Sequence, residues 1–227
     1  PERSDLEAKL YQHLSILFTH LNKLRMGRKF ARRAFALWRQ LNSTQGKLDC
    51  LMALAYNARW EKRLYQAERR LKVVQDNILL GHHYTQYAIV LYERGAVAIE
   101  RDAYDEAEQM LLKANEFFLS LNMQHHLALT YQSLGLAATC QQKFRSALKS
   151  LRQARELWKE VGYAYGVADI RVAEGFLEYK RGHLTRAEIL VDGAEELSTF
   201  VNDVTLRTSL QDSIDHLRRL IRGDQQR

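Results

Sequence analysis

The stretch YQSLGLAATCQQKFRSALKSLRQA, residues 131–154, decides the fold, because its spacing recurs along almost the whole chain. It carries a small residue at Gly135, an aromatic residue at Phe144, and further small residues at Ala147 and Ala154. Each of these four positions has a small or large apolar counterpart of matching size 40 residues earlier and 40 residues later. A fixed period between 20 and 50 residues is the signature of a repeat array.

Five such columns stay in phase for about 200 residues, and the alanine column is the clearest. The columns are Gly27, Ala67, Ala107, Ala147 and Ala187; Ser15, Ala55, Gly95, Gly135 and Gly175; Leu24, Leu64, Tyr104, Phe144 and Leu184; Ala31, Leu71, Leu111, Leu151 and Val191; and Ala34, Val74, Ala114, Ala154 and Ala194. Small residues permit two helices to cross closely, and the large residues of the neighbouring helix fill the adjoining grooves. The columns therefore predict stacked pairs of helices.

The chain lacks the signals that would interrupt helices. Its one proline is Pro1, and no run alternates strictly between apolar and polar residues, so strands are not predicted. We expect helices near 5–25, 27–42, 45–60, 64–81, 84–100, 104–121, 124–140, 144–161, 164–180, 184–201 and 203–222. Glycines, which adopt positive φ at little cost, are expected to mark turns at Gly46, Gly81, Gly162, Gly166 and Gly182.

The predicted fold is all-α: a right-handed α-solenoid of five helix-turn-helix repeats with a C-terminal capping helix. We expect a single superhelical domain over residues 1–227, because each repeat rests on its neighbours. The expected repeats cover approximately residues 8–47, 48–87, 88–127, 128–167 and 168–207. The last helix, near 203–222, has apolar residues on one face and charged residues on the rest, as a terminal cap requires.

Composition limits the compartment and the class of protein. No run of 18 apolar residues is present, and the first residues do not resemble a signal peptide. The two cysteines, Cys50 and Cys140, form no CxxC motif and suggest no disulfide framework, so a cytoplasmic location is expected. The chain begins with Pro1 rather than Met, which indicates either a trimmed chain or a domain of a longer protein.

The columns resemble the tetratricopeptide repeat (TPR), with the best copy at Tyr131, Leu134, Gly135, Phe144, Ala147, Leu151 and Ala154. The resemblance covers roughly residues 8–207. The 40-residue period is longer than the usual TPR length of about 34. It is similar to the long subclass found in kinesin light chains, spindle-orientation adaptors and the sensor arms of bacterial transcription activators. The connecting residues 161–166 are similar to the joint of that subclass.

The resemblance implies a concave groove lined by the first helix of each repeat. The residues that this register places in the groove are Met52, Tyr56, Arg59, Trp60, Tyr92, Ile99, Glu100, Leu136, Phe176, Tyr179 and Lys180. An apolar, aromatic strip with a charged rim is typical of an interaction site for a peptide or an amphipathic helix. The alternative is that tight winding of the superhelix buries half of these side chains. Chaperone tails are not favoured as partners, because the groove contains no Asn for the carboxylate clamp of chaperone-binding TPRs.

The net charge is +7, and the densest group of cations forms a basic patch near the first helix turn. Its members are Lys23, Arg25, Arg28, Lys29, Arg32 and Arg33. A basic patch attracts nucleic acid or an acidic partner. A solvated helix face is the favoured interpretation, because long cationic side chains commonly cover helix exteriors. No recognised nucleic-acid motif accompanies the patch, so nucleic acid is not the expected partner.

The sequence contains no recognised catalytic motif, so we expect that the protein is not an enzyme and binds no cofactor or metal. The histidine pairs 82–83 and 125–126 lie in successive joints between repeats and offer four imidazoles, but adjacent side chains diverge, which favours ordinary joint residues. Cys50 and Cys140 are interpreted as small buried hydrophobic residues. The acids between Glu93 and Glu108 are typical of a solvated turn and the start of a helix.

Three functions follow in order of preference. The first is a protein-protein interaction module or scaffold. The second is a ligand- or peptide-sensing regulatory domain, acting in signalling or transcription regulation within a larger bacterial regulator. The third is binding of nucleic acid or an acidic partner through the basic patch. A protein or peptide partner is expected, together with contacts to other domains of a longer chain.

Overall fold

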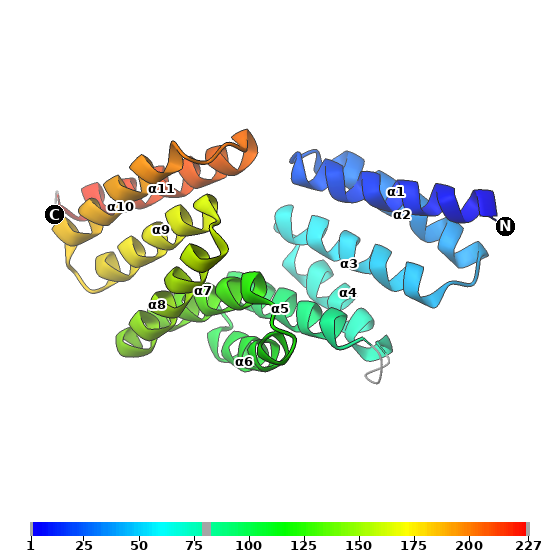
Figure 1. Cartoon of the computed structure of the whole chain (residues 1–227), viewed down its shortest axis with the longest axis horizontal. Coiled ribbons are helices and arrows are strands. Elements are labelled where there is room, and N and C mark those ends of the chain that lie inside the picture. Colours follow the sequence, from blue (N-terminus) through cyan, green and yellow to red (C-terminus); the bar gives the residue numbers. More distant parts are fainter. Residues whose placement is uncertain (1, 79–82, 226–227) are drawn as a thin grey trace. The chain divides into compact units, whose positions relative to one another are not determined.

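The computed structural model describes residues 2–78 and 83–225, and within that part it consists of eleven helices without a strand (Figure 1). The helices are α1 (Glu2–His20), α2 (Leu24–Gln40), α3 (Thr44–Trp60), α4 (Leu64–Asn77), α5 (Tyr84–Glu100), α6 (Tyr104–Ser120), α7 (Gln124–Cys140), α8 (Phe144–Val161), α9 (Ala164–Lys180), α10 (Leu184–Ser198) and α11 (Val204–Gln225). The all-α prediction is confirmed, and most predicted boundaries agree within three residues.

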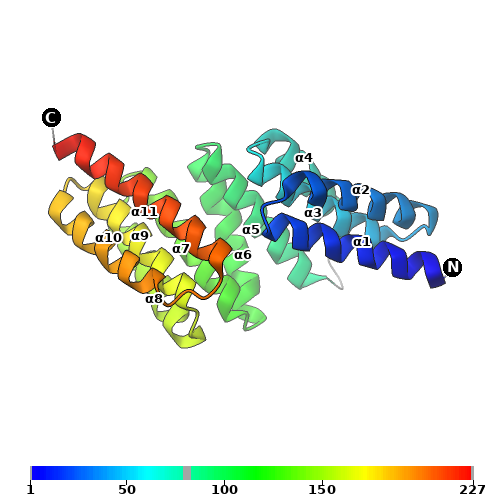
Figure 2. The same cartoon turned by 90° about the horizontal axis from the view of Figure 1, so that it is seen from above.

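The chain divides into two compact units. The N-terminal unit, residues 1–103, contains α1 to α5, and the C-terminal unit, residues 104–227, contains α6 to α11. Within each unit consecutive helices run antiparallel and pack side by side (Figures 1 and 2). The single continuous domain expected from the repeat remains a prediction.

Among the described residues, positive φ angles recur at steps of 20 residues, or of 40 across residues 79–82, and form the turns. The residues are Asn22, Asn42, Lys62, Asp102, Asn122, Gln142, Gly162 and Gly182, with φ between 52° and 79°. At the first of these turns, Lys23 N–H donates to Phe18 C=O and Asn22 N–H donates to Thr19 C=O. These two bonds form a Schellman motif, which satisfies the last carbonyl groups of a helix.

Two of the glycines predicted to mark turns have a different role. Gly46 and Gly166 lie buried inside α3 and α9, and a Cβ there would come within 2.3 Å and 2.4 Å of the indole rings of Trp38 and Trp158. Glycine is required at these positions by close packing rather than by backbone conformation. Of the other predicted turn residues, Gly162 and Gly182 have positive φ, and Gly81 lies outside the described residues.

The first predicted turn was also misplaced. The break between the first two helices lies at residues 21–23 rather than after residue 25, and Gly27 lies inside α2. A Cβ on Gly27 would lie 2.5 Å from Thr19 Oγ1 and 3.0 Å from Asn57 Oδ1. The glycine therefore occupies the small column of the repeat, where α2 crosses α1 and α3.

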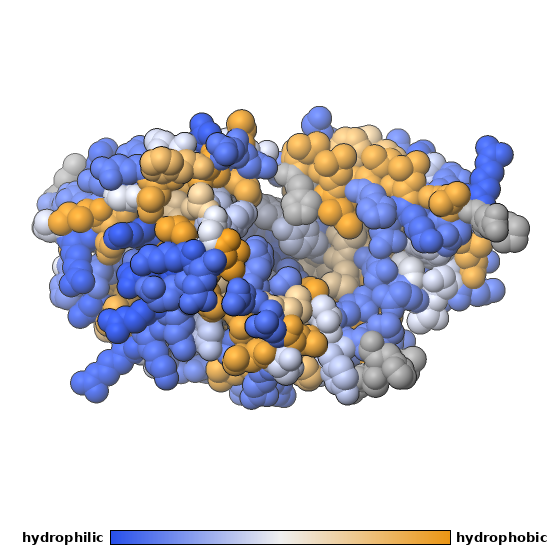
Figure 3. All heavy atoms as spheres, viewed as in Figure 1, coloured by the Kyte–Doolittle hydropathy of each residue, from blue (hydrophilic) through white to orange (hydrophobic). Residues whose placement is uncertain are grey.

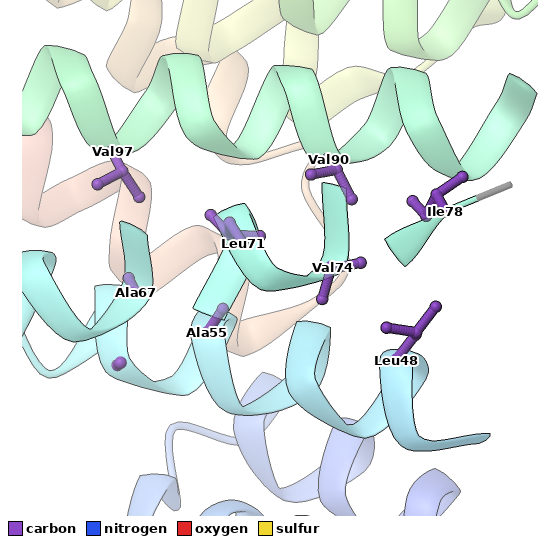
Figure 4. Close-up of a cluster of buried hydrophobic side chains, with 9 residues drawn as sticks. Leu48, Ala55, Ala67, Leu71, Val74, Ile78, Val90 and Val97 are labelled. Atoms are coloured by element: carbon purple, nitrogen blue, oxygen red, sulfur yellow. The ribbon is translucent and has the colours of Figure 1, made fainter. Parts of the chain in front are cut away.

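The alanine and leucine columns form the core of each unit. In the N-terminal unit a cluster of buried side chains joins α3, α4 and α5, and Figure 4 shows them pointing toward one another. Its members are Leu48, Ala55, Ala58, Ala67, Leu71, Val74, Ile78, Val90 and Val97. Burial of such side chains contributes about 1.5–3 kcal/mol for each large residue, which explains why the columns recur.

The C-terminal helix covers the last repeat. Leu210, Ile214, Leu217 and Ile221 of α11 are buried against Ala187, Val191 and Ala194 of α10. Figure 2 shows α11 lying along α9 and α10. Charged residues of α11, such as Asp212 and Arg219, are exposed. This is the arrangement of a cap: apolar toward the repeat and polar toward water.

Candidate functional site

A pocket of about 400 Å³ opens in the N-terminal unit where its three first helices lie side by side. Its walls come from α1, α3 and α5, and α4 contributes one residue at the base. The lining residues are Gln12, Ile16, Thr19, Asp49, Met52, Ala53, Tyr56, Leu71, Ile89 and Glu93. First helices line the pocket because α2 packs behind α1 and α4 packs behind α3, which leaves the opposite faces of these first helices open.

The middle of the pocket is apolar. Ile16 of α1 is 44% exposed, and Met52 and Ile89 are half-buried on the facing helices. Tyr56 contributes an aromatic wall, and its ring meets the ring of Trp60 edge-on at 6.1 Å. Burial raises the pKa of the Tyr56 hydroxyl, so that side chain is neutral at physiological pH. A non-polar side chain of a partner would lose little solvation here and gain contacts.

One end of the pocket is a carboxylate held by amides. Asp49 Oδ1 accepts hydrogen bonds of 2.8 Å from Gln45 Nε2 and from Gln86 Nε2. Its Oδ2 lies 3.5 Å from Gln12 Nε2, and Gln12 Oε1 in turn accepts from Trp38 Nε1 at 3.2 Å. Among the described residues no cation forms an ion pair with Asp49. The amides orient the carboxylate but leave its negative charge uncompensated.

At the other end an ion-pair cluster joins α3 and α5. Arg59 donates to Glu93 Oε2 at 3.1 Å and to Glu100 Oε1 at 2.6 Å, and Lys62 donates to Glu100 Oε2 at 2.9 Å. Burial raises the pKa of Glu93, and the charge of Arg59 opposes that rise. Burial disfavours the charge of Arg59, but Glu93 and Glu100 outweigh it and raise its pKa. These ion pairs link α3 to α5, two neighbouring first helices.

The structure divides the predicted groove residues between the two units. Met52 and Tyr56 line the pocket, whereas Arg59 and Glu100 form the ion-pair cluster beside it. Trp60 is half exposed at the end of α3. The remaining two predicted residues of this unit, Tyr92 and Ile99, lie half-buried on α5. Gln12, Ile16, Asp49 and Ile89 also line the pocket, and Glu93, which the register had not placed in the groove, completes it.

Two of the predicted groove residues of the C-terminal unit, Phe176 and Tyr179, pack against the capping helix α11. Phe176 and Tyr179 stack with their ring centroids 6.3 Å apart, and both pack against the buried cluster of α11. The hydroxyl of Tyr179 donates to Asp224 Oδ2 at 2.7 Å. Lys180 lies 5.4 Å over the ring of Phe176, and Leu136 is half-buried on α7. Phe176 and Tyr179 thus belong to the packing of the last helix.

The amide–carboxylate arrangement of the pocket recurs three periods later in the C-terminal unit. Trp158 Nε1 donates to Gln132 Oε1 at 3.1 Å, and Gln132 Nε2 donates to Asp169 Oδ2 at 2.6 Å. Sequence reasoning did not identify this chain of bonds. The signal was present, because Trp, Gln and Asp all recur at the same three-period spacing.

Asp169 provides a prediction about pH. Burial raises the pKa of this carboxyl above its usual 3.8, and the hydrogen bond from Gln132 opposes the rise. A carboxyl whose folded pKa is raised costs stability as pH rises from its unfolded pKa through the folded value. We expect Asp169→Asn to raise Tm at pH 7 and to have no such effect below pH 3.8. Thermal melts of both proteins from pH 3 to 8 test this, and an equal gain at every pH would contradict it.

The predicted basic patch lies on the outer helix α2 and the turn before it. Lys23, Arg25, Lys29, Arg32 and Arg33 are exposed, whereas Arg28 is half-buried. The half-buried side chain forms an ion pair with Glu61, and the guanidinium of Arg33 lies 5.7 Å over the ring of Tyr11. The patch is therefore partly neutralised by its own neighbours.

Helix α4 adds cations to this face that the sequence reasoning missed. Burial lowers the pKa of Arg70, and the charges of Arg63, Arg32 and Arg28 lower it further. The Arg70 guanidinium donates to Leu54 C=O at 3.0 Å. Repulsion between these side chains shows that cations of α2 and α4 gather on one outer face of the N-terminal unit. A role for this face in binding remains a prediction.

Of the paired histidines, His125 and His126 lie in packed surroundings, whereas His83 is exposed. His125 meets Trp158 at 4.9 Å and His126 meets Phe118 at 4.9 Å, and burial lowers the pKa of both imidazoles. In the described part of the chain no group of three or more His, Cys, Asp or Glu is arranged to hold a metal. His82 lies outside the described residues.

The two cysteines differ in burial. Cys50 is buried, as predicted, and burial followed by the charge of Asp49 raises the pKa of its thiol to about 12. The thiol is therefore protonated at physiological pH and a poor nucleophile. Cys140 is only half-buried.

Three other hollows have charged side chains in their walls. One of about 650 Å³ lies over Asp212, Asp215, Arg218, Arg219 and Arg222 of α11, and one of about 280 Å³ lies between α10 and α11. The third, of about 430 Å³ at the turn before α2, also has Leu24 and Met26 in its wall. No helix in residues 2–78 or 83–225 is both long and apolar enough to span a membrane.

Comparison with known proteins rests on structure alone. No protein-family model matches the sequence, and no curated protein matches it either. The putative kinesin light chain of Podospora anserina, solved with nearly identical TPR-like repeats, is 12% identical with a TM-score of 0.64, over 87% of this chain and 96% of that one. The chain has the TPR-like fold.

Two further TPR-like neighbours are Rap-type proteins. Aspartyl phosphate phosphatase F from Bacillus subtilis is 13% identical with a TM-score of 0.68, over 95% of this chain. A Rap protein complexed with Competence and Sporulation Factor is 14% identical with a TM-score of 0.69, over 96% of this chain. The TPR-like chain spans 61% and 66% of the lengths of these two proteins.

Proposed function

We propose that this chain is a non-enzymatic protein-interaction module whose N-terminal unit binds a peptide or an amphipathic helix in the pocket of α1, α3 and α5. The observation that carries the proposal is an open apolar pocket placed between orienting carboxylates, Asp49 and Glu93. TPR-like proteins of known structure include one solved in complex with Competence and Sporulation Factor, which supports a ligand-binding role for this fold.

The lining suggests the chemistry of the occupant. An aliphatic or aromatic side chain fits among Ile16, Met52 and Tyr56, because burial of apolar area drives such contacts. Asp49 has only neutral amides around it, and Glu93 already has a cationic partner in Arg59. A Lys or Arg of the partner would therefore bind at the Asp49 end, and the charge pair would orient the bound segment.

Selection from a displayed library of random peptides against the purified chain tests the proposal. We expect enriched peptides to carry a large apolar residue next to a Lys or Arg. Ile16→Trp fills the pocket and should weaken binding of a selected peptide at least about 10-fold, equivalent to about 1.4 kcal/mol. Asp49→Asn keeps the shape and should weaken binding mainly at low salt, because it removes the charge.

Ile189→Trp is the matched control. Ile189 is 66% exposed on α10 of the C-terminal unit, so the same substitution adds the same apolar surface away from the pocket. Affinity of the selected peptide is measured by fluorescence anisotropy for the three variants and the parent chain. Equal loss with Ile16→Trp and Ile189→Trp, or no loss with either, would contradict a binding site at this pocket.

The second proposal is that the module senses its ligand for a larger regulator of signalling or transcription. Ligand-dependent regulation requires that the bound and free states differ in conformation. The pocket supports this function because three separate helices meet at it, so that a ligand touching all three would bias their spacing. Hydrogen exchange of α1, α3 and α5, with and without a selected peptide, distinguishes a sensor from a rigid scaffold.

A further inference from the structure

A long stretch of the N-terminal unit carries cations and no acid. Residues 8–48, which include the whole of α2, contain nine Lys or Arg and no Asp or Glu. The second helix of the third repeat differs, because α6 carries Asp105, Glu106, Glu108 and Glu116. The repeat therefore does not require cations on its second helices, and their concentration on α2 needs a separate explanation.

Six exposed side chains form two rows in matching register, here called the outer rows. They are Arg25, Lys29 and Arg32 on α2, and Tyr65, Arg69 and Lys72 on α4, one period later. A spacing of four and three residues places each row along one face of its helix. Helix α2 packs on α1 and α3, and α4 packs on α3 and α5 (Figure 2). The outer rows are exposed because their helices make these packing contacts with other faces.

Side chains between the outer rows show that α2 and α4 bring their cations together. Glu61, at the turn before α4, pairs both with Arg28 of α2 and with Arg63. Burial lowers the pKa of Arg70 on α4, and the charges of Arg63 and of Arg32 on α2 lower it further. Charges that affect one another in this way lie close together, so the two rows belong to one surface.

The cations of the outer rows lack acidic partners. Among the described residues, none of these five cations forms an ion pair. The nearby acids are already engaged, because Glu61 pairs with two arginines and Glu68 of α4 pairs with Arg94 of α5. Asp76, one turn beyond Lys72, marks the end of the α4 row. Five uncompensated cations on one surface attract a polyanion.

The exposure of these cations favours nucleic acid over an acidic protein segment. An exposed ion pair with a carboxylate contributes little, because both charges are already well hydrated. A nucleic-acid strand instead carries condensed counterions, and their release makes exposed cations effective in binding. Apolar anchors, on which protein partners depend, gather over α1 instead of along the outer rows (Figure 3).

An exposed aromatic ring in the α4 row indicates which form of nucleic acid fits. Tyr65 is 77% exposed and lies four residues before Arg69. An aromatic ring beside phosphate-binding cations stacks on an unpaired base. Bases of a duplex stack on one another, so their faces are not available to Tyr65. The sequence did not favour nucleic acid because no motif accompanied the cations of α2, and the structure adds Tyr65 and the cations of α4 to the same surface.

We propose that the outer rows of α2 and α4 bind single-stranded RNA or DNA, with the cations on its phosphates and one base stacked on Tyr65. Each row spans seven residues, or about 10 Å along its helix, so a strand lying across both rows meets cations at successive phosphates. No residue of the outer rows lines the pocket of α1, α3 and α5. The strand and the peptide of the proposed function therefore bind at separate places.

Fluorescence anisotropy of a labelled oligouridylate of about 12 nucleotides tests the proposal. We expect a Kd of about 1–100 μM at about 0.15 M salt, the range of binding driven by charge. With five phosphate contacts, the logarithm of the association constant should fall against the logarithm of salt concentration with a slope of about −3.5. Lys29→Glu combined with Arg32→Glu should weaken binding at least about 10-fold and reduce the slope by about 1.4, because two contacts are lost.

Lys149→Glu combined with Arg152→Glu on α8 is the matched control. Both residues are exposed, and they repeat the types and spacing of Lys29 and Arg32 three periods later, so the net charge changes equally. The second helices before and after α8 carry acids in this register, such as Asp105. Affinity of the control should stay within about threefold of the parent chain, because distant charges are screened by salt.

Substitution of Tyr65 tests the stacked base. Tyr65→Ala should weaken binding of the single strand at least about 5-fold and leave binding of a duplex unchanged, whereas Tyr65→Phe retains the ring and should bind like the parent chain. Circular dichroism and Tm of all these variants should equal those of the parent chain, because the substituted side chains are exposed.

Four outcomes would overturn the proposal. They are no binding of the single strand by the parent chain, equal losses from the α2 and α8 variants, full affinity of Tyr65→Ala for the single strand, and displacement of the strand by polyglutamate at equal charge concentration. The last would indicate an acidic protein partner. Affinity for a selected peptide should be unchanged in the α2 variant, since Lys29 and Arg32 do not line the pocket. The two sites thus fail or succeed independently.

Discussion

Trp158→Ala is expected to lower the free energy of unfolding by about 3–5 kcal/mol, the usual cost of truncating a buried aromatic side chain. Trp158 is 1% exposed, and its indole fills the space over Gly166, where no Cβ fits. Its ring also contacts Tyr163 at 5.3 Å, and its Nε1 donates to Gln132. The substitution leaves a large cavity and removes the donor to a part-buried amide.

Thermal and urea unfolding followed by circular dichroism measure this effect, with an expected fall in Tm of about 10 °C. Trp60→Ala is the matched control, because Trp60 is 50% exposed and should change stability by less than about 1 kcal/mol. Similar losses at the two tryptophans would show that the packing of α8 on α9 is not as described.

Ala147→Leu is expected to destabilise the C-terminal unit by about 1–3 kcal/mol or more through overpacking. Ala147 is 0% exposed in the alanine column of α8, where that helix crosses α7. The neighbouring positions are already tight, since a Cβ on Gly135 would lie 2.5 Å from a methyl group of Leu151. Three extra carbons have no space there without separation of the helices.

Ser146→Leu makes the matched comparison one position earlier. Ser146 is exposed on the same helix, so the added leucine should alter stability by no more than about 0.5 kcal/mol. Urea unfolding of the three proteins gives the difference directly. A melting temperature of Ala147→Leu equal to that of the parent chain would show that the register of the repeat is wrong.

Much of the fold could be predicted from the sequence, because the recurring residues show the period of the repeat directly. The alanine column predicted the close helix crossings, and Ala67, Ala107, Ala147 and Ala187 are all fully buried. The TPR resemblance predicted a groove lined by first helices; Met52 and Tyr56 lie in the pocket, and their role in binding remains a prediction. These features depend on the sizes of side chains at fixed intervals, and both the sizes and the intervals are visible in the sequence.

The turns were predicted less well, for a local reason. Glycine is the residue expected at such turns, yet most positive φ angles belong to Asn, Asp, Lys or Gln, such as Asn22 and Lys62. These residues tolerate the left-handed conformation when a Schellman motif holds the helix end. Gly46 and Gly166 were misassigned because a glycine required by an indole ring looks the same in sequence as one required by a turn.

Tertiary structure alone decided which polar residues meet. Gln12 and Asp49 are 37 residues apart, and Asp49 also accepts from Gln86, so these contacts depend on the packing of three helices. The tertiary structure likewise places Phe176 and Tyr179 against the capping helix α11. Sequence determined the period and the size pattern, and packing in three dimensions decided which faces are covered and which remain open, because exposure depends on neighbours that local sequence does not specify.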